Sequence, residues 1–344
     1  MTRLKCLAKG TPIIALILIL LGCSKPLTVV SYGGGSYQQA LKTSFSEPFS
    51  RNKSSKVQLV SWNAVYGQLQ EMVASDNVSW DVVEVTAAQF ERGKRDNLFE
   101  KLDLHLNTAD YLPGSVDPYG VASVYWSTVL AYPLSDATAG IQPHTWSDFW
   151  DVRKFPGKRA MYDDPRGNIE FALLADGVPA SEVYAHMDLD RAFRKLDQIK
   201  PHILKWWSDG TEPIQLLLTH QVAMTTAWNG RLFASKEARQ GVQYSWVGAA
   251  TDRTYWVIPR GSRHKQLAEE FIEFAASAAP LAEEAKLVGY GPPNLRTMDM
   301  LDDTLRIALP TYSQNMAVGF QVDTSWWASH EEQAKLRWLT WKSK

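Results

Sequence analysis

Apolar residues along the chain follow two alternating patterns. Short runs rich in β-branched residues indicate buried strands, and longer stretches with apolar positions three or four apart indicate helices. In the first part of the chain, strands are predicted at 27–32, 57–60 and 80–85, each followed by a helical stretch, at 37–49, 65–74 and 86–92. This alternation predicts an α/β fold whose sheet is mainly parallel, with helices on both faces.

The alternation resumes after a long apolar, β-rich segment at 119–132. We expect further strands at 158–162, 222–228 and 254–258, with helices at 146–150, 168–175, 189–199, 213–219, 231–239 and 264–276 and in the C-terminal tail. Two α/β regions joined by more than one crossover predict two lobes. Ligands in such folds bind beyond the carboxyl ends of strands and in clefts between lobes.

The start of the chain has the pattern of a secretory signal. Three cations (Arg3, Lys5 and Lys9) precede an apolar stretch at 13–21, and Leu-Leu-Gly-Cys follows at 20–23. The apolar stretch is too short to span a bilayer as a permanent helix, but it has the length of a signal h-region. We therefore expect residues 1–22 to be a signal peptide.

The cysteine at the end of this signal predicts a lipid anchor. A small residue directly before Cys23 looks like a bacterial lipobox, in which the cysteine is lipidated and becomes the mature N-terminus. The alternative is an ordinary signal peptide with an incidental cysteine. The lipobox interpretation places the protein outside the cytoplasm, periplasmic or extracytoplasmic and anchored to a membrane. Ser24 favours the outer membrane where the host has two.

Charge and cysteine content exclude several classes of protein. Processing removes three cations and no acids, which leaves 33 Lys and Arg against 37 Asp and Glu, a net charge of −4. A mildly acidic chain without a basic block argues against nucleic acid as a partner. Of the two cysteines, Cys6 leaves with the signal and Cys23 carries lipid, so we expect neither a disulfide nor a thiolate metal site.

Known catalytic motifs are absent from the sequence. The chain has no Gly-x-Ser-x-Gly elbow, no P-loop and no His-Glu-x-x-His, and Gly33-Gly34-Gly35 lacks the third glycine of a dinucleotide fingerprint. We expect no cofactor and no metal, and an enzyme has no positive support. Fourteen tryptophans are unusual for this length. They either fill a core or line a pocket for an apolar or cationic ligand.

Several motifs, in their order and spacing, resemble those of extracellular solute-binding proteins of ABC importers, specifically the spermidine/putrescine-type branch. The motifs that carry the resemblance are Ser31-Tyr32-Gly33-Gly34, Trp80-Asp81-Val82-Val83-Glu84, Thr145-Trp146-Ser147-Asp148-Phe149-Trp150, Phe155-Pro156-Gly157-Lys158, Ala227-Trp228-Asn229-Gly230, Gly289-Tyr290-Gly291-Pro292-Pro293-Asn294 and Leu309-Pro310-Thr311. The resemblance covers nearly all of the mature chain.

This resemblance implies a two-lobed periplasmic-binding-protein fold of type II, with a hinge and an interlobe cleft that closes on its ligand. We expect lobe 1 at 23–131, lobe 2 at 132–254, a return to lobe 1 at 255–310, and a C-terminal helical segment at 311–344 that packs across the lobes. It also implies an ABC permease as partner, a small-molecule ligand and a monomeric protein.

In the polyamine branch, aromatic side chains sandwich a methylene chain and carboxylates hold the ammonium ends, by cation–π contact and charge-assisted hydrogen bonds. The candidate ligand-binding residues are Tyr32, Glu84, Asp164, Trp228, Asn229, Asp252 and Tyr290. Three of them have a plain structural alternative: a core tyrosine for Tyr32, a surface acid or cap for Glu84, and a turn-forming residue before Pro165 for Asp164.

The chain departs from the polyamine pattern at three positions. Gly167 and Thr254 stand where amine-binding acids are usual, and Asp252 stands where a tryptophan is usual. Either Asp252 or Glu84 replaces a missing acid, or the ligand carries a single cationic group. We therefore expect a cationic amine as ligand but keep other solutes open.

Three possibilities besides an amine ligand stay open. The glycine turn at 33–36 opens a helix and suits a carboxylate or phosphonate, so an anion or a zwitterion fits the sequence too. A ferric ion needs clustered tyrosines, for which Tyr244 and Tyr255 are available. A lipid-anchored extracytoplasmic enzyme is the possibility from a different functional class.

Overall fold

The structure is a computed structural model that describes residues 26–32, 35–53, 55–138, 140, 142–185 and 187–344. The predicted signal peptide and Cys23 lie outside the described residues, as do Gly33 and Gly34 of the glycine turn. Among the described residues, no helix is both long and apolar enough to cross a membrane.

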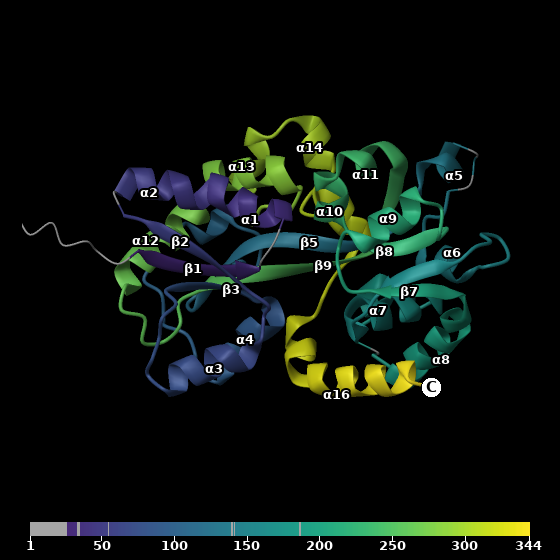
Figure 1. Ribbon diagram of the computed structural model, residues 1–344, viewed down its shortest axis with the longest axis horizontal. Helices are drawn as coiled ribbons and strands as arrows, with labels where there is room; N and C mark the ends of the chain where they lie inside the picture. The colour runs from purple at the N-terminus through teal and green to yellow at the C-terminus, as the bar shows by residue number, and fades with distance from the viewer. Residues whose placement is uncertain (1–25, 33–34, 54, 139, 141, 186) are drawn as a thin grey trace, which may run out of the picture.

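One mixed sheet runs through the described part of the chain, with ten strands in all (Figure 1). Its main path has the order β2-β1-β3-β9-β5-β8-β6-β7, while β10 pairs with β9 and β4 with β5. The strands are β1 (Leu27–Tyr32), β2 (Val57–Trp62), β3 (Val82–Thr86), β4 (Val116–Asp117), β5 (Gly120–Pro133), β6 (Arg159–Tyr162), β7 (Ile203–Trp207), β8 (Met224–Trp228), β9 (Val242–Val257) and β10 (Phe320–Gln321).

The pairing divides the sheet into two parallel halves joined by two long antiparallel strands. Strand β1 pairs in parallel with β2 and β3, and β6 pairs in parallel with β7 and β8. Strands β5 and β9 pair antiparallel with each other and lie between the halves. We call the half containing β2, β1 and β3 the first lobe and the half containing β8, β6 and β7 the second lobe.

Strand β9 is much longer than predicted. The sequence indicated a strand only at 254–258. The structure extends it back to Val242. Gly248 adopts a positive φ of 68° within the strand, and a register shift separates Thr128 from Leu130 on the neighbouring β5. These irregularities break the period-two alternation by which a strand is recognised in a sequence.

Helices cover both faces of each half of the sheet, as the alternation predicted (Figure 1). In the first lobe, α1, α2 and α13 lie on one face and α3 and α4 on the other. The helices are α1 (Gly35–Leu41), α2 (Glu47–Lys53), α3 (Tyr66–Ala74), α4 (Ala87–Arg95), α5 (Leu134–Thr138), α6 (Trp146–Trp150), α7 (Pro165–Ala175), α8 (Leu189–Ile199), α9 (Glu212–Leu218), α10 (Asn229–Ala234), α11 (Lys236–Gly241), α12 (Lys265–Ala275), α13 (Ala278–Val288), α14 (Asp303–Ile307), α15 (Ser313–Val318) and α16 (Thr324–Lys342).

Most of the tryptophans fill cores. Trp207 and Trp327 are fully buried, and Trp256 and Trp338 nearly so. Burying a large aromatic side chain contributes more apolar area than any aliphatic one, which suits a domain without a disulfide. The tryptophan-rich tail therefore belongs to the core of the second lobe.

Helix α16 connects the two lobes at the end of the fold. It packs against α4 of the first lobe and α7 of the second. Since β5 and β9 also pass through both halves, each lobe is assembled from segments far apart in the sequence. The residue boundaries that we assigned to the lobes from the sequence stay predictions.

Candidate functional site

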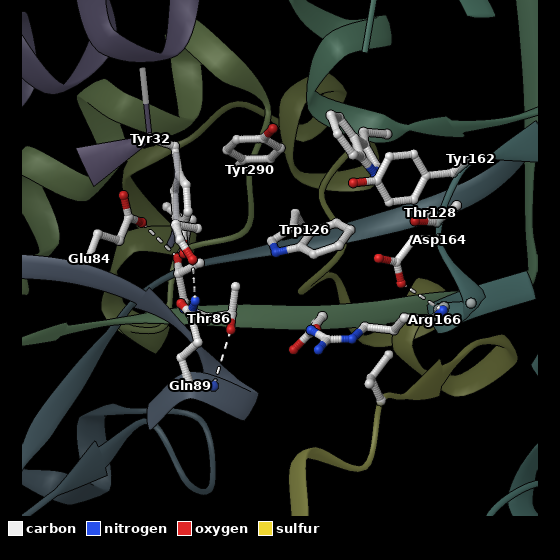
Figure 2. Close-up of a pocket in the computed structure, with 18 of the residues that line it drawn as sticks. Tyr32, Glu84, Thr86, Gln89, Trp126, Thr128, Tyr162, Asp164, Arg166 and Tyr290 are labelled. Atoms are coloured by element: carbon white, nitrogen blue, oxygen red, sulfur yellow. Dashed lines mark hydrogen bonds and ion pairs between the residues drawn. The ribbon is translucent and has the colours of Figure 1, made fainter. Parts of the chain in front are cut away.

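A cavity of about 470 Å³ lies between the two lobes. Its walls come from β1, α1, β3 and α4 of the first lobe, from the start of α7, β8 and α10 of the second, from the connecting strands β5 and β9, and from α16. Figure 2 shows Tyr32 and Glu84 at one end, Tyr162 and Asp164 at the other, and Trp126 between them.

The cavity brings together most of the residues that the sequence suggested. The predicted residues that line it are Tyr32, Glu84, Asp164, Trp228, Asp252 and Tyr290. Asn229 is the exception and is not part of the wall. Its buried amide accepts a hydrogen bond from the backbone N–H of Ser127 at 2.9 Å and donates one to the carbonyl oxygen of Gly289 at 2.8 Å, so it joins β5 to the end of α13.

Glu84 is at the wall but is already satisfied by the protein. Three hydroxyl groups donate to its Oε1, each at 2.7 Å, from Tyr37, Ser123 and Thr254. The hydroxyl of Ser31 donates to the other carboxylate oxygen. A buried carboxylate needs this many donors to replace lost water. Glu84 thus ties its own strand β3 to β1 and α1 of the first lobe and to the connecting strands β5 and β9. Thr254, which stands where the sequence suggested a missing acid, is a hydrogen-bond donor to Glu84.

Asp164 has one oxygen in use and one free. It is the N-cap of α7, and its Oδ1 accepts the backbone N–H of Arg166 at 2.9 Å, while Pro165 occupies the first helical position. No described residue donates to its Oδ2. Burial raises the pKa of Asp164, although Arg166 and Lys335 act in the opposite direction. The same residue therefore caps a helix and offers a carboxylate oxygen to the cavity.

Arg166 is the first site residue that sequence reasoning missed. Its buried guanidinium lies 3.4 Å from Oδ2 of Asp252 and 3.2 Å from Oε1 of Glu331, and 5.3 Å from the ring centroid of Trp327. Burial raises the pKa of Asp252, and the charge of Arg166 partly offsets this. Arg166 lies at the N-terminal end of α7, where its own ψ of 130° and the positive φ of Gly167 are not helical, and no local signal in the sequence singles it out.

Arg231 is the second cation that the sequence did not reveal, and it lies in the short helix α10. Its buried Nε has no hydrogen-bond partner, and it forms no ion pair within the described part of the chain. The neighbouring Tyr290 also lines the cavity, and burial raises the pKa of that tyrosine to about 12 against the opposing charge of Arg231. Arg231 is therefore an unpaired cation at the cavity wall.

Aromatic rings surround Trp228 at the second-lobe end. The ring centroids of Tyr162 and Trp207 are each 5.1 Å from that of Trp228, and the centroid of Trp126 is 6.1 Å away, all in edge-on geometry. The indole Nε1 of Trp228 and the Oη of Tyr32 are buried without a partner among the described residues. Buried polar atoms are normally paired, and these two belong to residues of the cavity wall, so both are available to a ligand.

The residues expected for a ferric site lie outside this cavity, and the anion site expected at the glycine turn stays a prediction. Neither Tyr244 nor Tyr255 lines the cavity, and no group of three or more His, Cys, Asp or Glu in the described residues could hold a metal ion. The Oη of Tyr255 donates to the carbonyl oxygen of Gly114 at 2.6 Å. The anion site expected at 33–36 includes residues outside those described.

Comparisons with known proteins agree on the class. A model of the bacterial extracellular solute-binding protein family matches residues 46–302. The gamma-aminobutyric acid-binding protein of Pseudomonas aeruginosa is 36% identical over 93% of this chain and 92% of its own length. The solved structure of the GABA receptor Atu4243 has a TM-score of 0.85 at 35% identity, covering 93% of this chain and 98% of that one.

A third relative is solved as a complex with a ligand. The binding protein MotA from A. tumefaciens B6, solved in complex with glucopine, has a TM-score of 0.81 at 27% identity and covers 92% of this chain and 99% of its own. None of these three relatives is named for a polyamine, so the comparisons support the family and not specifically the spermidine/putrescine branch. The chain belongs to the bacterial extracellular solute-binding protein family, and it is the substrate-binding component of an ABC importer rather than an enzyme.

Proposed function

We propose that the ligand is a small zwitterion with one ammonium group and one carboxylate a few methylene groups apart, of the size and charge of gamma-aminobutyric acid. One observation carries this proposal. Among the charged groups of the cavity wall, Arg166, Asp252, Glu331 and Lys335 form ion pairs with one another, and both oxygens of Glu84 accept hydrogen bonds. Asp164 and Arg231 form no ion pair among the described residues, and each keeps a polar atom without a partner. The unused charges are one anion and one cation, which is the complement of a zwitterion.

The ammonium group binds at the acidic part of the wall. Asp164 and Asp252 both contact Arg166. Asp164 accepts the backbone N–H of Arg166, and Asp252 faces the guanidinium of Arg166. The rings of Tyr162 and Trp228 border the same end of the cavity, and a cation over such rings gains a further attraction.

The carboxylate binds at Arg231. A guanidinium presents two parallel N–H groups to a carboxylate, and the pair is strongest where water is excluded. The neighbouring Tyr290 and the unpartnered Oη of Tyr32 supply further polar groups on the side of the first lobe. A ligand held by Arg231 and Asp164 in the second lobe and by Tyr32 in the first would favour closure of the cleft.

The relatives support this ligand class by what their names state. Two of them are named for gamma-aminobutyric acid, and one is solved with glucopine. A polyamine-like amine, which the sequence favoured, is the second candidate. The charges of the wall favour it to a small extent, because four carboxylates (Glu84, Asp164, Asp252 and Glu331) face three cations (Arg166, Arg231 and Lys335).

Titration calorimetry with four compounds of similar length separates the two candidates. The compounds are 4-aminobutanoate, 1-aminobutane, butanoate and 1,4-diaminobutane. We expect 4-aminobutanoate to bind at least tenfold more tightly than the other three, since it alone satisfies both unused charges. Tighter binding of the diamine would establish the amine candidate instead, and tighter binding of butanoate would contradict both.

We also propose that the protein acts as a monomer, held at a membrane by lipid on Cys23 and delivering its ligand to an ABC permease in the inner membrane. The Leu-Leu-Gly-Cys motif at 20–23 supports the anchor. A single acyl chain binds membranes only marginally, so stable anchoring requires two or more. The membership in the solute-binding family supports the permease as partner.

A further inference from the structure

We propose that Glu331 of α16 is a positioning residue for ligand capture: it holds the guanidinium of Arg166 when the ligand's ammonium group displaces that guanidinium from Asp252. This inference rests on the proposed function, because it takes the ligand to carry an ammonium group. It assigns to the C-terminal helix a part in binding that the motifs of the sequence did not suggest.

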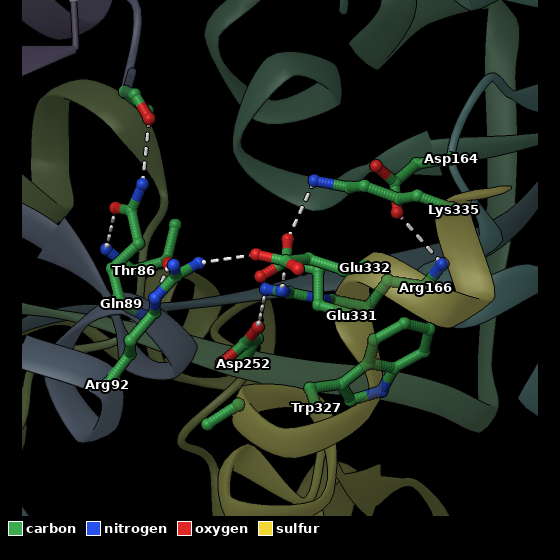
Figure 3. A network of polar contacts seen from close by, with 12 residues as sticks. Thr86, Gln89, Arg92, Asp164, Arg166, Asp252, Trp327, Glu331, Glu332 and Lys335 are labelled. Carbon is green, nitrogen blue, oxygen red and sulfur yellow. Dashed lines mark hydrogen bonds and ion pairs between the residues drawn. The ribbon is translucent and has the colours of Figure 1, made fainter. Parts of the chain in front are cut away.

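Figure 3 shows Arg166 between its two acidic partners, with Trp327 on the other side of the cation. One terminal nitrogen of Arg166 faces Oδ2 of Asp252 at 3.4 Å, and the other faces Oε1 of Glu331 at 3.2 Å. Both separations are longer than the 2.7–2.9 Å typical of a tight charged hydrogen bond. The guanidinium is thus shared between two carboxylates and optimally bound to neither.

Each oxygen of Asp252 already has one donor. Its Oδ1 accepts the backbone N–H of Arg253 at 2.7 Å, and its Oδ2 faces Arg166 at 3.4 Å. A carboxylate oxygen accepts more than one hydrogen bond, but an ammonium group at Oδ2 would lie beside the guanidinium, and the repulsion between the two cations favours displacement of Arg166 from Asp252. Releasing Arg166 without another partner would leave a buried, unpaired charge, which is among the most costly changes in a protein interior.

Glu331 is charged and close enough to bind the released guanidinium. Burial raises its pKa, but Arg166 and Lys335 outweigh that effect and hold the pKa of Glu331 below its ordinary value, so it is charged. Lys335, one turn further along α16, contacts the same Oε1 at 2.7 Å. The guanidinium carbon of Arg166 lies 5.3 Å from the ring centroid of Trp327, which provides a cation–π contact.

The position of Glu331 is fixed by the anchoring of α16. The indole N–H of Trp327 donates to Oε1 of the fully buried Glu170 at 2.7 Å, and the hydroxyl of Tyr184 donates to the same oxygen at 2.5 Å. The helix therefore keeps Glu331 within reach of Arg166 whether or not Asp252 is occupied. Because a ligand ammonium and Arg166 compete for Asp252, the pull of Glu331 on Arg166 favours the ligand.

The next residue along α16 provides a matched control for the test. Glu332 has the same charge but is exposed, does not line the cavity, and pairs with Arg92 of α4 at 3.0 Å. Glu331→Gln and Glu332→Gln thus remove the same charge at adjacent positions. Titration calorimetry with 4-aminobutanoate should show about a tenfold loss of affinity for Glu331→Gln and less than a twofold change for Glu332→Gln. Equal effects of the two substitutions, or no effect of Glu331→Gln, would overturn the inference.

A double substitution distinguishes positioning from direct attraction of the ligand by Glu331. In an Arg166→Gln background the competing cation is absent, so adding Glu331→Gln should change affinity less than twofold relative to Arg166→Gln alone. A tenfold effect of Glu331→Gln that persists in that background would overturn the inference. Thermal unfolding of each variant checks the fold; where Arg166→Gln does not fold, Arg166→Met, which also removes the competing cation, provides the background instead.

The two proposals fail in different ways. If the unmodified protein does not bind 4-aminobutanoate or any of the amines, the proposed function is wrong. If it binds and Glu331→Gln binds equally well, the function stands and the role of Glu331 is wrong.

Discussion

The ring of Tyr290 lies against the backbone of Gly230, so closely that a Cβ atom at position 230 would be 2.1 Å from Cε1 of the tyrosine. A second glycine repeats this arrangement in the opposite direction, since a Cβ on Gly289 would be 2.3 Å from Cγ of Phe233. Helix α10 of the second lobe and the end of α13 thus meet through two contacts in which an aromatic ring covers a glycine. Tyr290 can form the cavity wall only because residue 230 has no side chain.

Gly230→Ala should therefore displace Tyr290 and weaken ligand binding. Overpacking of this kind typically costs about 1–3 kcal/mol of stability, so we expect a lower midpoint in denaturant unfolding together with reduced affinity in calorimetry. Gly67→Ala is the control, because nothing lies within 4 Å of a Cβ at this position in α3. That change should stabilise the protein by about 0.5–1 kcal/mol, since alanine is the better helix former. An unaltered affinity in Gly230→Ala would show that the contact is dispensable for binding.

Asp164→Asn and Arg231→Gln should each weaken binding of 4-aminobutanoate by about 10- to 100-fold, because each removes a charge-assisted hydrogen bond worth about 1.5–3 kcal/mol. The two changes should differ toward partial ligands: Asp164→Asn should retain the weak affinity for butanoate, and Arg231→Gln the weak affinity for 1-aminobutane. Calorimetry with the four compounds measures both effects.

Two nearby residues serve as charge-matched controls for these substitutions. Asp163 pairs with Lys342, and Arg239 donates to the carbonyl oxygen of Phe233; neither residue lines the cavity. Asp163→Asn and Arg239→Gln should leave affinity within twofold. The assignment of the two ligand ends would be reversed if Asp164→Asn selectively lost butanoate.

Trp228→Ala should lower affinity about tenfold. A ring that faces a cation in a desolvated site contributes about 1–2 kcal/mol, and the substitution also removes the partner of Tyr162 and Trp207. Trp228→Phe keeps an aromatic face and should recover part of the loss. Trp246→Ala removes a half-buried tryptophan outside the cavity and should not change affinity. Binding that survives Trp228→Ala at full strength would make Trp228 a structural residue.

Ligand binding should weaken as the pH falls, and it should do so at a higher pH than an ordinary aspartate would predict. Burial raises the pKa values of both Asp164 and Asp252 above 3.8. An ammonium ligand requires their ionised forms, so affinity is full above the raised pKa values and is lost as the pH drops through them. Calorimetry between pH 7 and pH 4 measures this dependence.

The stability of the empty protein should change in the opposite direction. An acid whose pKa is raised in the folded state binds its proton more tightly when folded, so these two groups stabilise the empty fold most at low pH and lose that contribution as the pH rises through the raised values. Thermal unfolding with and without 4-aminobutanoate should therefore converge toward acid pH. A ligand-induced shift that grows on acidification would contradict the carboxylate assignment.

Membrane attachment should depend on Cys23. Cys23→Ala removes the atom that carries lipid in a lipobox, so the variant should move from the membrane to the soluble fraction after cell fractionation. Cys6→Ala is the matched control, because Cys6 precedes the apolar stretch of the signal and should not affect attachment. Membrane retention of Cys23→Ala would contradict the lipid anchor.

The sequence predicted the α/β alternation well because strands and helices with one buried face leave a local periodic pattern. It predicted β9 poorly, because the positive φ of Gly248 and the register shift beside it interrupt that pattern. The role of Glu84 could not be recognised for a different reason. Two of its hydroxyl donors, Ser123 and Thr254, are 39 and 170 residues away along the chain. Their proximity exists only after the strands pair.

Within the cavity, residues with a distinctive local context were predictable and the two arginines were not. Asp164 stands before a proline at a helix start, and Trp228 ends a strand, so each has a local signal. Arg166 and Arg231 have long cationic side chains, and such side chains are usually exposed. Nothing in the local sequence indicates that these two lie in the cavity wall. Only an arrangement in three dimensions shows that one is paired with Asp252 and the other has no partner among the described residues.

Helix α16 has a consequence for the order in which the protein becomes functional. It contributes Glu331 and Lys335 to the cavity wall, and Trp327 to the core of the second lobe. A chain that emerges with its N-terminus first can pair most of its sheet before residues 324–342 arrive, yet its cavity then lacks one side. Premature capture of solute by a nascent chain is thereby disfavoured, and binding competence is a late event in biogenesis.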